Sequence, residues 1–111
     1  MNIKSKFWIT LDGEKVFGKG PCTLLKMVEK LGSLNKAAKE LNMSYSKAWG
    51  IINRAERLLG YSLLETKTGG TGGGGSYLTD KAKILIKDYD LFSNEARISL
   101  EGIFKKYFKG L

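Results

Sequence analysis

The segment that most constrains this chain is residues 32–59, whose spacing is that of two short helices joined by a tight turn. Ala37 and Ala38 are small where the two helices would have to come close. Asn42 stands where the chain must turn, a position that favours a residue tolerant of positive φ. Ser44 is a suitable N-cap for the second helix. The segment therefore predicts a helix-turn-helix, a unit that typically places its second helix in the major groove of DNA.

The second helix of this unit is expected to run from about Tyr45 to Leu59 and to have two different faces. Apolar residues at spacings of three and four predict the face toward the core, formed by Ala48, Ile51, Ile52, Ala55, Leu58 and Leu59. The opposite face carries hydroxyl, amide and cationic side chains, which can hydrogen-bond base edges or phosphates. The predicted DNA-contacting residues of this segment are Ser44, Tyr45, Ser46, Lys47, Trp49, Gly50, Asn53 and Arg54, with Arg57 beside them.

Two residues of that outer face have more than one interpretation. Gly50 is unusual inside a helix, where glycine costs roughly 1 kcal/mol, and a close approach to the DNA backbone would explain it. Trp49 is either an exposed DNA contact or a partly packed side chain. Because tryptophan is usually largely buried, partial packing is the favoured alternative.

The charge of the chain is consistent with a polyanionic partner. The formal net charge is +8 and the pI is about 9.6. Residues 1–79 hold 12 Lys and Arg against 6 Asp and Glu, whereas residues 80–111 hold 7 against 5. Double-stranded DNA is the partner that this distribution favours. The alternative, a merely soluble basic protein, stays open on charge alone.

A glycine tract after the second helix predicts a β wing over residues 63–79. Two short extended segments flank the tract, which has no Gly-Lys-Ser/Thr and does not lead into a helix, so a phosphate-binding loop is excluded. Glycines at a wing tip would let the backbone approach the sugar-phosphate edge. A flexible linker without a function is the alternative. The predicted wing contacts are Lys67, Thr68, Gly70, Thr71 and Gly72.

The remainder of residues 1–79 predicts an N-terminal β-hairpin and two helices. Asp12-Gly13 is a strong turn signal for a hairpin over residues 6–17. Pro21 suits the first turn of the following helix, and Gly32 ends it. Ser33 can cap the next helix, over residues 34–41. Residues 1–79 are thus expected to form one winged helix-turn-helix domain.

Residues 80–111 predict one long helix, with Thr79 as its cap. Its apolar residues extend along about 45 Å of helix, more than a small monomer can cover. The simplest remedy is a homodimer in which two copies of the helix pair. The alternative is that the helix folds back within one chain. The predicted dimerisation stripe is Leu85, Tyr89, Phe92, Ala96, Leu100, Ile103 and Tyr107. A neighbouring face carries Ile84, Leu91 and Ile98, and Phe104 and Phe108 follow near the end.

The composition gives little support to an enzyme, a metal site or a membrane protein. The chain has no histidine, which removes the commonest general base, and Cys22 is its one cysteine. Zinc sites and disulfides are therefore not expected, nor is any cofactor, and Cys22 is expected to be a small buried residue. No apolar run approaches 18 residues and no signal peptide is recognisable. The expected location is the cytoplasm, in association with the nucleoid.

The order of these motifs resembles one known family. The segment Ser44-Tyr45-Ser46-Lys47-Ala48-Trp49 and the wing sequence of residues 68–75 together are similar to the DNA-binding domain of the molybdate-responsive (ModE-type) transcription regulators. The similarity covers about residues 20–107. Leu78-Thr79 and the helix after it resemble, more distantly, the regulators of the LysR type.

The resemblance implies a homodimer, joined through the long C-terminal helix, that binds a pseudo-palindromic operator and controls genes of molybdate metabolism. Residues 44–54 would supply the recognition helix and residues 67–75 the wing. Members of the ModE family carry a C-terminal oxyanion-binding region after this helix, and no residue here can be assigned to molybdate. We therefore expect no oxyanion site within this chain, and an effector could act through a separate protein.

The sequence thus predicts a mainly α protein with a small β component, namely a winged helix-turn-helix with an N-terminal hairpin and a long C-terminal dimerisation helix. The predicted function is a sequence-specific transcription regulator, not an enzyme. Two alternatives remain, a sequence-neutral architectural DNA-binding protein and a winged-helix module for protein interaction.

Overall fold

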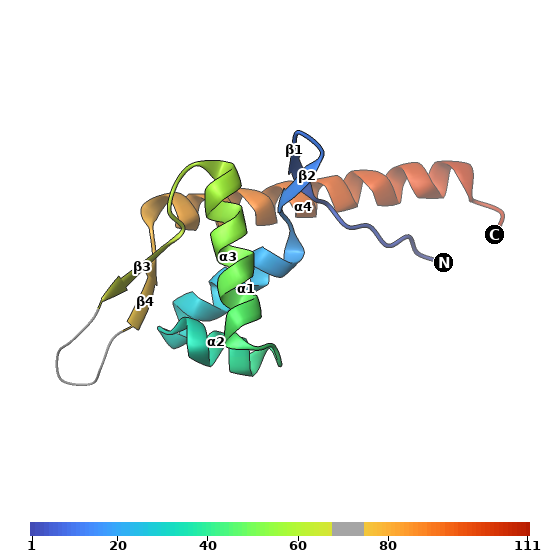
Figure 1. Cartoon of the computed structure of the whole chain (residues 1–111). Coiled ribbons are helices and arrows are strands. Elements are labelled where there is room, and N and C mark those ends of the chain that lie inside the picture. Colours follow the sequence, from blue (N-terminus) through green and yellow to red (C-terminus); the bar gives the residue numbers. More distant parts are fainter. Residues whose placement is uncertain (68–74) are drawn as a thin grey trace.

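The structure is a computed structural model that describes residues 1–67 and 75–111. Its described part has four helices and two small antiparallel sheets, which confirms the predicted mainly α fold class (Figure 1). The elements in chain order are β1 (Ile9–Leu11), β2 (Glu14–Phe17), α1 (Lys19–Leu31), α2 (Leu34–Glu40), α3 (Tyr45–Leu59), β3 (Leu64–Lys67), β4 (Gly75–Leu78) and α4 (Asp80–Tyr107).

The helix-turn-helix forms where the sequence predicts it, and its turns are set by local interactions. Asn42 has φ 55° between α2 and α3. The Oγ of Ser33 accepts a hydrogen bond from Lys36 N over 3.2 Å, and the Oγ of Ser44 accepts one from Lys47 N over 3.1 Å. These caps satisfy donors that the first turn of a helix leaves without an intrahelical partner.

The first helix begins two residues earlier than Pro21, with Gly18 as its N-cap. Gly20 therefore lies in the first turn of the helix. This position is tolerated because first-turn amides have no intrahelical acceptor, so neither Gly20 nor Pro21 loses a hydrogen bond there. Gly32 ends the helix in the left-handed conformation, with φ 74°, as predicted.

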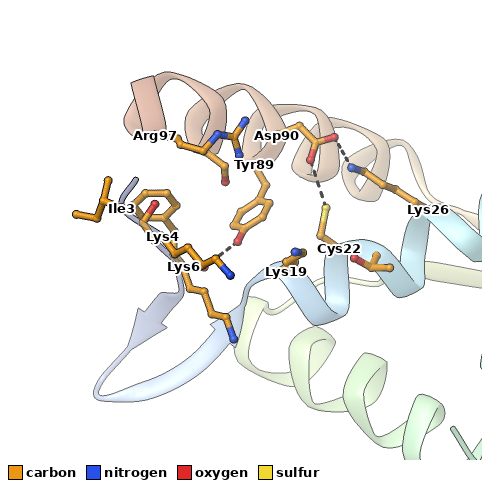
Figure 2. A pocket seen from close by; sticks show the side chains of 13 residues that line it. Ile3, Lys4, Lys6, Lys19, Cys22, Lys26, Tyr89, Asp90 and Arg97 are labelled. Atoms are coloured by element: carbon orange, nitrogen blue, oxygen red, sulfur yellow. Dashed lines mark hydrogen bonds and ion pairs between the residues drawn. The ribbon is translucent and has the colours of Figure 1, made fainter. Parts of the chain in front are cut away.

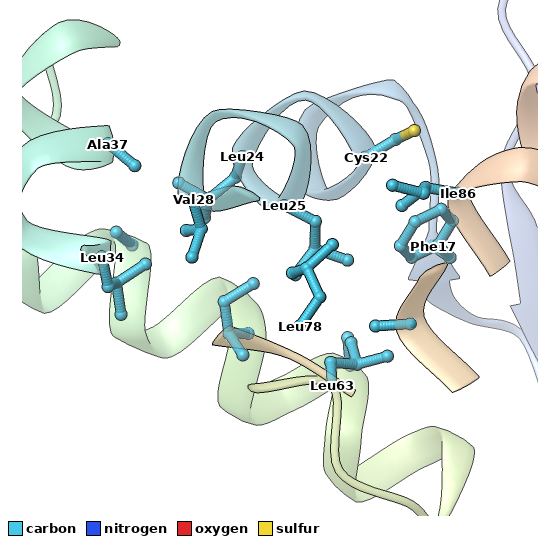
Figure 3. Packing of buried hydrophobic residues seen from close by; sticks show 14 of the residues in the cluster. Phe17, Cys22, Leu24, Leu25, Val28, Leu34, Ala37, Leu63, Leu78 and Ile86 are labelled. Atoms are coloured by element: carbon cyan, nitrogen blue, oxygen red, sulfur yellow. The ribbon is translucent and has the colours of Figure 1, made fainter. Parts of the chain in front are cut away.

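Among the residues that the structure describes, one hydrophobic core joins the helix-turn-helix to β2, to β4 and to the start of α4. Ala37 and Ala38 are both buried, on a helix that contacts α1 on one side and α3 on another. Cys22 is also buried, as expected. We call residues 9–67 and 75–90, which surround this core, the head. Figure 3 labels core residues from β2, α1, α2, the two ends of the wing and α4: Phe17, Cys22, Leu24, Leu25, Val28, Leu34, Ala37, Leu63, Leu78 and Ile86.

The two strands of the wing pair antiparallel, with Leu64 opposite Leu78 and Lys67 opposite Gly75. The wing is attached to the head through β4, because Ser76 N donates a hydrogen bond to Gly32 O over 3.0 Å. A Cβ at Gly75 would lie 2.9 Å from the same carbonyl oxygen, so this position requires glycine. The end of α1 therefore fixes where the wing leaves the core.

The N-terminal hairpin is shorter than residues 6–17 and carries one buried end. Asp12 and Gly13 both have positive φ, 50° and 81°, which is the geometry of a tight hairpin turn. All three residues of β1 are exposed, whereas Phe17 at the end of β2 is fully buried. The ring of Phe17 packs edge-on against Tyr89 of α4, with centroids 5.4 Å apart. The hairpin is thus tied to the C-terminal helix.

Helix α4 begins in the core and then extends beyond the head (Figure 1). Thr79 caps it as predicted, accepting a hydrogen bond from Ala82 N over 3.1 Å. Its buried residues are Ala82, Ile86 and Tyr89, all in the first ten residues of the helix. The rest of α4 carries exposed apolar side chains, namely Leu91, Phe92, Ile98, Ile103 and Tyr107, and Phe108 follows its end.

Candidate nucleic-acid interface

Helix α3 separates a buried face from an exposed one, as its sequence predicts. Ala48, Ile52 and Ala55 are buried against the core, and Ile51 and Leu58 pack partly on it. The opposite face is open to solvent. Every residue predicted there is exposed, namely Tyr45, Ser46, Lys47, Trp49, Gly50, Asn53, Arg54 and Arg57.

Trp49, predicted to be either an exposed DNA contact or a partly packed side chain, is about half exposed. Its side chain is 52% exposed, so part of it packs and part faces solvent. Tyr45, one turn earlier, is also 52% exposed. Two large exposed aromatic residues on one face of a helix give it apolar surface that could contact thymine methyl groups or sugars.

Gly50 leaves an open space on the outer face of α3. A Cβ built at Gly50 would meet, within 4 Å, no atom of the described residues other than its chain neighbours and the nearby backbone of α3 itself. The protein itself therefore gives no steric reason for glycine at this position. The interpretation that something outside the protein approaches here stays a prediction.

The cations of this surface have no acidic partner among residues 1–67 and 75–111. The ion pair that the described part of the chain contains joins Lys26 and Asp90, away from α3. Lys47, Arg54 and Arg57 are therefore available for contact with phosphates. A cluster of uncompensated cations beside a solvent-exposed helix is the electrostatic pattern of a nucleic-acid-binding surface.

The wing contributes Lys67 to the same set of predicted contacts. Lys67 is exposed, and its Nζ lies 5.2 Å from the ring centroid of Tyr77 on the paired strand. This cation–π contact holds the ammonium group at the described end of the wing. The other predicted wing contacts, Thr68, Gly70, Thr71 and Gly72, lie outside the described residues.

Ser44 has a structural role in addition to the one predicted for it. Its Oγ is occupied as acceptor by the cap of α3, at 3.1 Å from Lys47 N. The hydroxyl proton is still able to donate to a phosphate. The residue therefore orients α3 whether or not it contacts DNA.

One residue that positions the site was not found from the sequence. The carboxylate Oε2 of Glu56, on α3, accepts hydrogen bonds from Leu63 N over 2.7 Å and from Leu64 N over 3.2 Å. These bonds fix the start of the wing relative to the recognition helix. The sequence contains one indication of this role. Glu56 is a charged residue next to the predicted core face of α3, and a carboxylate near a core is tolerated only when it has a hydrogen-bond or ion-pair partner.

The pKa values of Cys22 and Lys26 are both higher than is usual for their side-chain types. Burial raises the pKa of the Cys22 thiol to about 11. The hydrogen bond between Lys26 and Asp90 raises the pKa of the lysine.

No group of three or more His, Cys, Asp or Glu side chains that could hold a metal ion occurs in the described part of the chain. Among the same residues, no helix has the length and apolarity needed to cross a bilayer.

The sequence of this chain matches the profile of a known protein family. The profile of the family described as "Bacterial regulatory helix-turn-helix protein, lysR family" matches residues 22–83. The chain belongs to this LysR family. The match begins in α1, contains the whole helix-turn-helix and the wing, and ends at the start of α4.

Among curated relatives, this LysR-family chain is similar to regulators named ModE. It is 42% identical over 71 residues to the DNA-binding transcriptional dual regulator ModE of Escherichia coli (strain K12), covering 64% of this chain and 27% of that protein. It is 43% identical over 63 residues to the molybdenum transport protein ModE of Herbaspirillum seropedicae, covering 57% and 23%. The chain therefore has a ModE-like helix-turn-helix and spans about a quarter of the length of these relatives.

A solved structure supports the fold of this LysR-family chain. The structure of ArgP from Mycobacterium tuberculosis superimposes with a TM-score of 0.53 at 19% identity, over 77% of this chain and 30% of that one. This similarity confirms the winged helix-turn-helix. The Escherichia coli relative is named as a DNA-binding transcriptional regulator, and the matching family is one of regulatory helix-turn-helix proteins, which are not enzymes. This agrees with the prediction that the chain is not an enzyme.

Proposed function

We propose that this chain is a sequence-specific DNA-binding transcription regulator that acts as a homodimer on a pseudo-palindromic operator. The observation that carries the proposal is the exposed outer face of α3, on which Lys47, Arg54 and Arg57 have no acidic partner among the described residues. Membership of the LysR family and the ModE-like sequence support it.

In the proposed complex, α3 enters the major groove and the cations set its register. Lys47, Arg54 and Lys67 contact phosphates, which supply affinity without sequence information. Asn53 and Ser46 reach base edges, where an amide can form a bidentate pair with adenine. The Glu56 carboxylate holds the wing at a fixed place beside α3, so that both elements meet one duplex.

The homodimer is proposed to form through the outer part of α4. Ile103 is 53% exposed and Tyr107 is 70% exposed, and both belong to the predicted stripe. Pairing two such helices would cover apolar surface that a single chain leaves in water. Leu85 and Tyr89, the first two residues of the stripe, are already covered by the chain's own core, so the proposed interface is carried by Phe92, Ala96, Leu100, Ile103 and Tyr107.

The relatives' names suggest which genes such a regulator controls. We propose that its targets include genes of molybdate or other oxyanion metabolism, because relatives named ModE include a transcriptional regulator and a molybdenum transport protein. The described residues offer no assignment of a molybdate site, and we propose none within them.

Selection from fragmented genomic DNA, washed at about 150 mM salt, tests the whole proposal, because nonspecific contacts are weak at that salt concentration. Recovery of a short two-fold-related motif is the expected result, and the neighbouring genes would name the pathway. Fragments without a shared motif would indicate a sequence-neutral architectural protein. Recovery of no DNA, even when washed at low salt, would indicate a protein-interaction module.

A further inference from the structure

A cavity of about 580 Å³ lies between the N-terminal segment, α1 and α4 (Figure 2). Its volume is within the range of small-molecule sites, roughly 300–1,000 Å³. None of the residues that line it belongs to α3 or to the wing strands. The proposed contact with DNA therefore gives this cavity no role.

The charges around the cavity are mostly positive. Asp90 is the carboxylate that lines it, and its Oδ2 lies 2.6 Å from Lys26 Nζ. That ion pair compensates one cation and leaves the others without an acidic partner among the described residues. Burial raises the pKa of the Cys22 thiol to about 11, so this side chain is neutral at pH 7 and does not oppose an anion. The cationic side chains that line the cavity are Lys4, Lys6, Lys19, Lys26 and Arg97.

Other parts of the lining are apolar or carry an unused hydroxyl. Phe7 and Tyr89 supply aromatic surface, and the hydroxyl of Tyr89 is already engaged with the main-chain oxygen of Phe7 at 2.8 Å. The Oγ of Ser93 is buried and has no hydrogen-bond partner among the described residues. Because a buried hydroxyl without a partner is costly, an acceptor atom of a ligand would stabilise this position.

We propose that this cavity binds a small organic anion, with an apolar or aromatic body and one carboxylate or phosphate group. The uncompensated cations favour the negative charge, and the aromatic wall favours the apolar body. The volume is many times the roughly 30 Å³ that one water takes up in the liquid, and so suits a molecule larger than a bare tetrahedral oxyanion. Lys19 of α1 and Arg97 of α4 would hold the charged group from two elements, and Ser93 would donate to it.

Calorimetric titration of the full chain with phenyl phosphate and with benzoate tests the proposal and separates the two anionic groups. Inorganic phosphate and benzyl alcohol represent the two halves of the ligand. At least one of the two intact probes is expected to bind saturably below about 1 mM, and both halves about tenfold more weakly or not at all. The assay contains no DNA, so its failure would leave the proposed function untouched.

The variant Lys19→Gln/Arg97→Gln is expected to weaken binding of the preferred probe about tenfold. The matched control, Lys36→Gln/Lys109→Gln, removes the same two charges from positions outside the cavity and is expected to leave affinity within about twofold. Ser93→Ala should weaken binding several-fold while the thermal midpoint of the free protein stays unchanged or rises, because the variant removes an unpaired buried hydroxyl.

Three results would overturn the proposal. The first is the absence of saturable binding by either intact probe at millimolar concentration. The second is equal loss of affinity in the cavity variant and in its control. The third is binding that weakens as the protein concentration is raised, because that result would mean that a second copy of the chain fills the cavity.

Discussion

The hydroxyl of Tyr89 donates a hydrogen bond to the main-chain oxygen of Phe7 over 2.8 Å, which joins α4 to a segment 82 residues earlier in the chain. The ring of the same tyrosine packs edge-on against Phe17. The N-terminal segment is therefore attached to the head through a residue of the long helix. This attachment also forms one wall of the cavity between them.

Replacing Tyr89 by phenylalanine should remove this hydrogen bond and keep the ring packing, while the edge-on contact of Phe7 with Phe92 remains. The expected loss is about 1 kcal/mol in the free energy of unfolding, the usual contribution of one hydrogen bond. Chemical denaturation measures it. Tyr45→Phe is the control, because Tyr45 is 52% exposed, lies outside the proposed dimer interface and has a hydroxyl without a hydrogen-bond partner among the described residues. Equal stability of the two variants would contradict a structural role for the Tyr89 hydroxyl.

Glu56→Ala should destabilise the junction of α3 and the wing. The substitution leaves Leu63 N and Leu64 N without their acceptor, and an unsatisfied buried donor costs about 1–3 kcal/mol. Amide hydrogen exchange should show the loss of protection confined first to these two residues. Glu65→Ala, at an exposed position in β3, is the matched control and should change stability by less than about 0.5 kcal/mol.

Tyr89 and Glu56 also show which parts of the structure could be predicted from the sequence. The capping and turn residues could be identified from the sequence because each acts on its own helix end or turn, within a few residues. They are Ser33, Ser44, Thr79, Gly32 and Asn42. The carboxylate of Glu56 and the hydroxyl of Tyr89 act on main-chain groups 7 and 82 residues away. The hydrophobic periodicity of a sequence does not indicate which distant main-chain group a polar side chain will bind.

The apolar stripe of α4 shows a second limit of the sequence. Leu85 and Tyr89 have the same spacing as Ile103 and Tyr107, yet the first pair packs on the chain's own core and the second is exposed. A helical period identifies an apolar face but does not say what covers it. The chain's own packing therefore divides the predicted stripe into a part inside the head and a part beyond it.

Gly50→Ala should stabilise the protein and weaken its binding to DNA. Alanine in a helix interior is favoured over glycine by roughly 1 kcal/mol, and the new methyl group meets no other atom within 4 Å. The same methyl group would stand between α3 and a closely approaching DNA backbone. Gly102→Ala, in α4, is the matched control, because its Cβ also meets nothing within 4 Å and it lies outside the proposed DNA contacts. Equal DNA affinity of both variants would mean that no backbone approaches Gly50.

Asn53→Ala and Arg54→Ala should have different effects on the operator complex. Loss of a phosphate contact at Arg54 or Lys67 should weaken binding to all sequences and reduce the slope of log K against log salt by about one. Loss of Asn53 should instead relax the preference at one base pair by about 1–3 kcal/mol and leave the slope unchanged. Fluorescence anisotropy over a salt series, with operator and scrambled duplexes, separates the two outcomes. Unchanged affinity and slope for Arg54→Ala and Lys67→Ala would exclude the proposed docking face.

Ile103→Glu should convert the proposed dimer to a monomer. The substitution places a charge among apolar side chains that the dimer would bury, and burying an unpaired charge costs several kcal/mol. Sedimentation equilibrium measures the dissociation constant, and affinity for a two-fold operator should fall while affinity for a half-site is unchanged. Lys105→Gln changes the net charge by the same amount on the opposite side of the helix and should leave the dimer intact. A wild-type chain that stays monomeric at tens of micromolar, or a variant that dimerises as well as the wild type, would show that the outer part of α4 is covered by something other than a second copy.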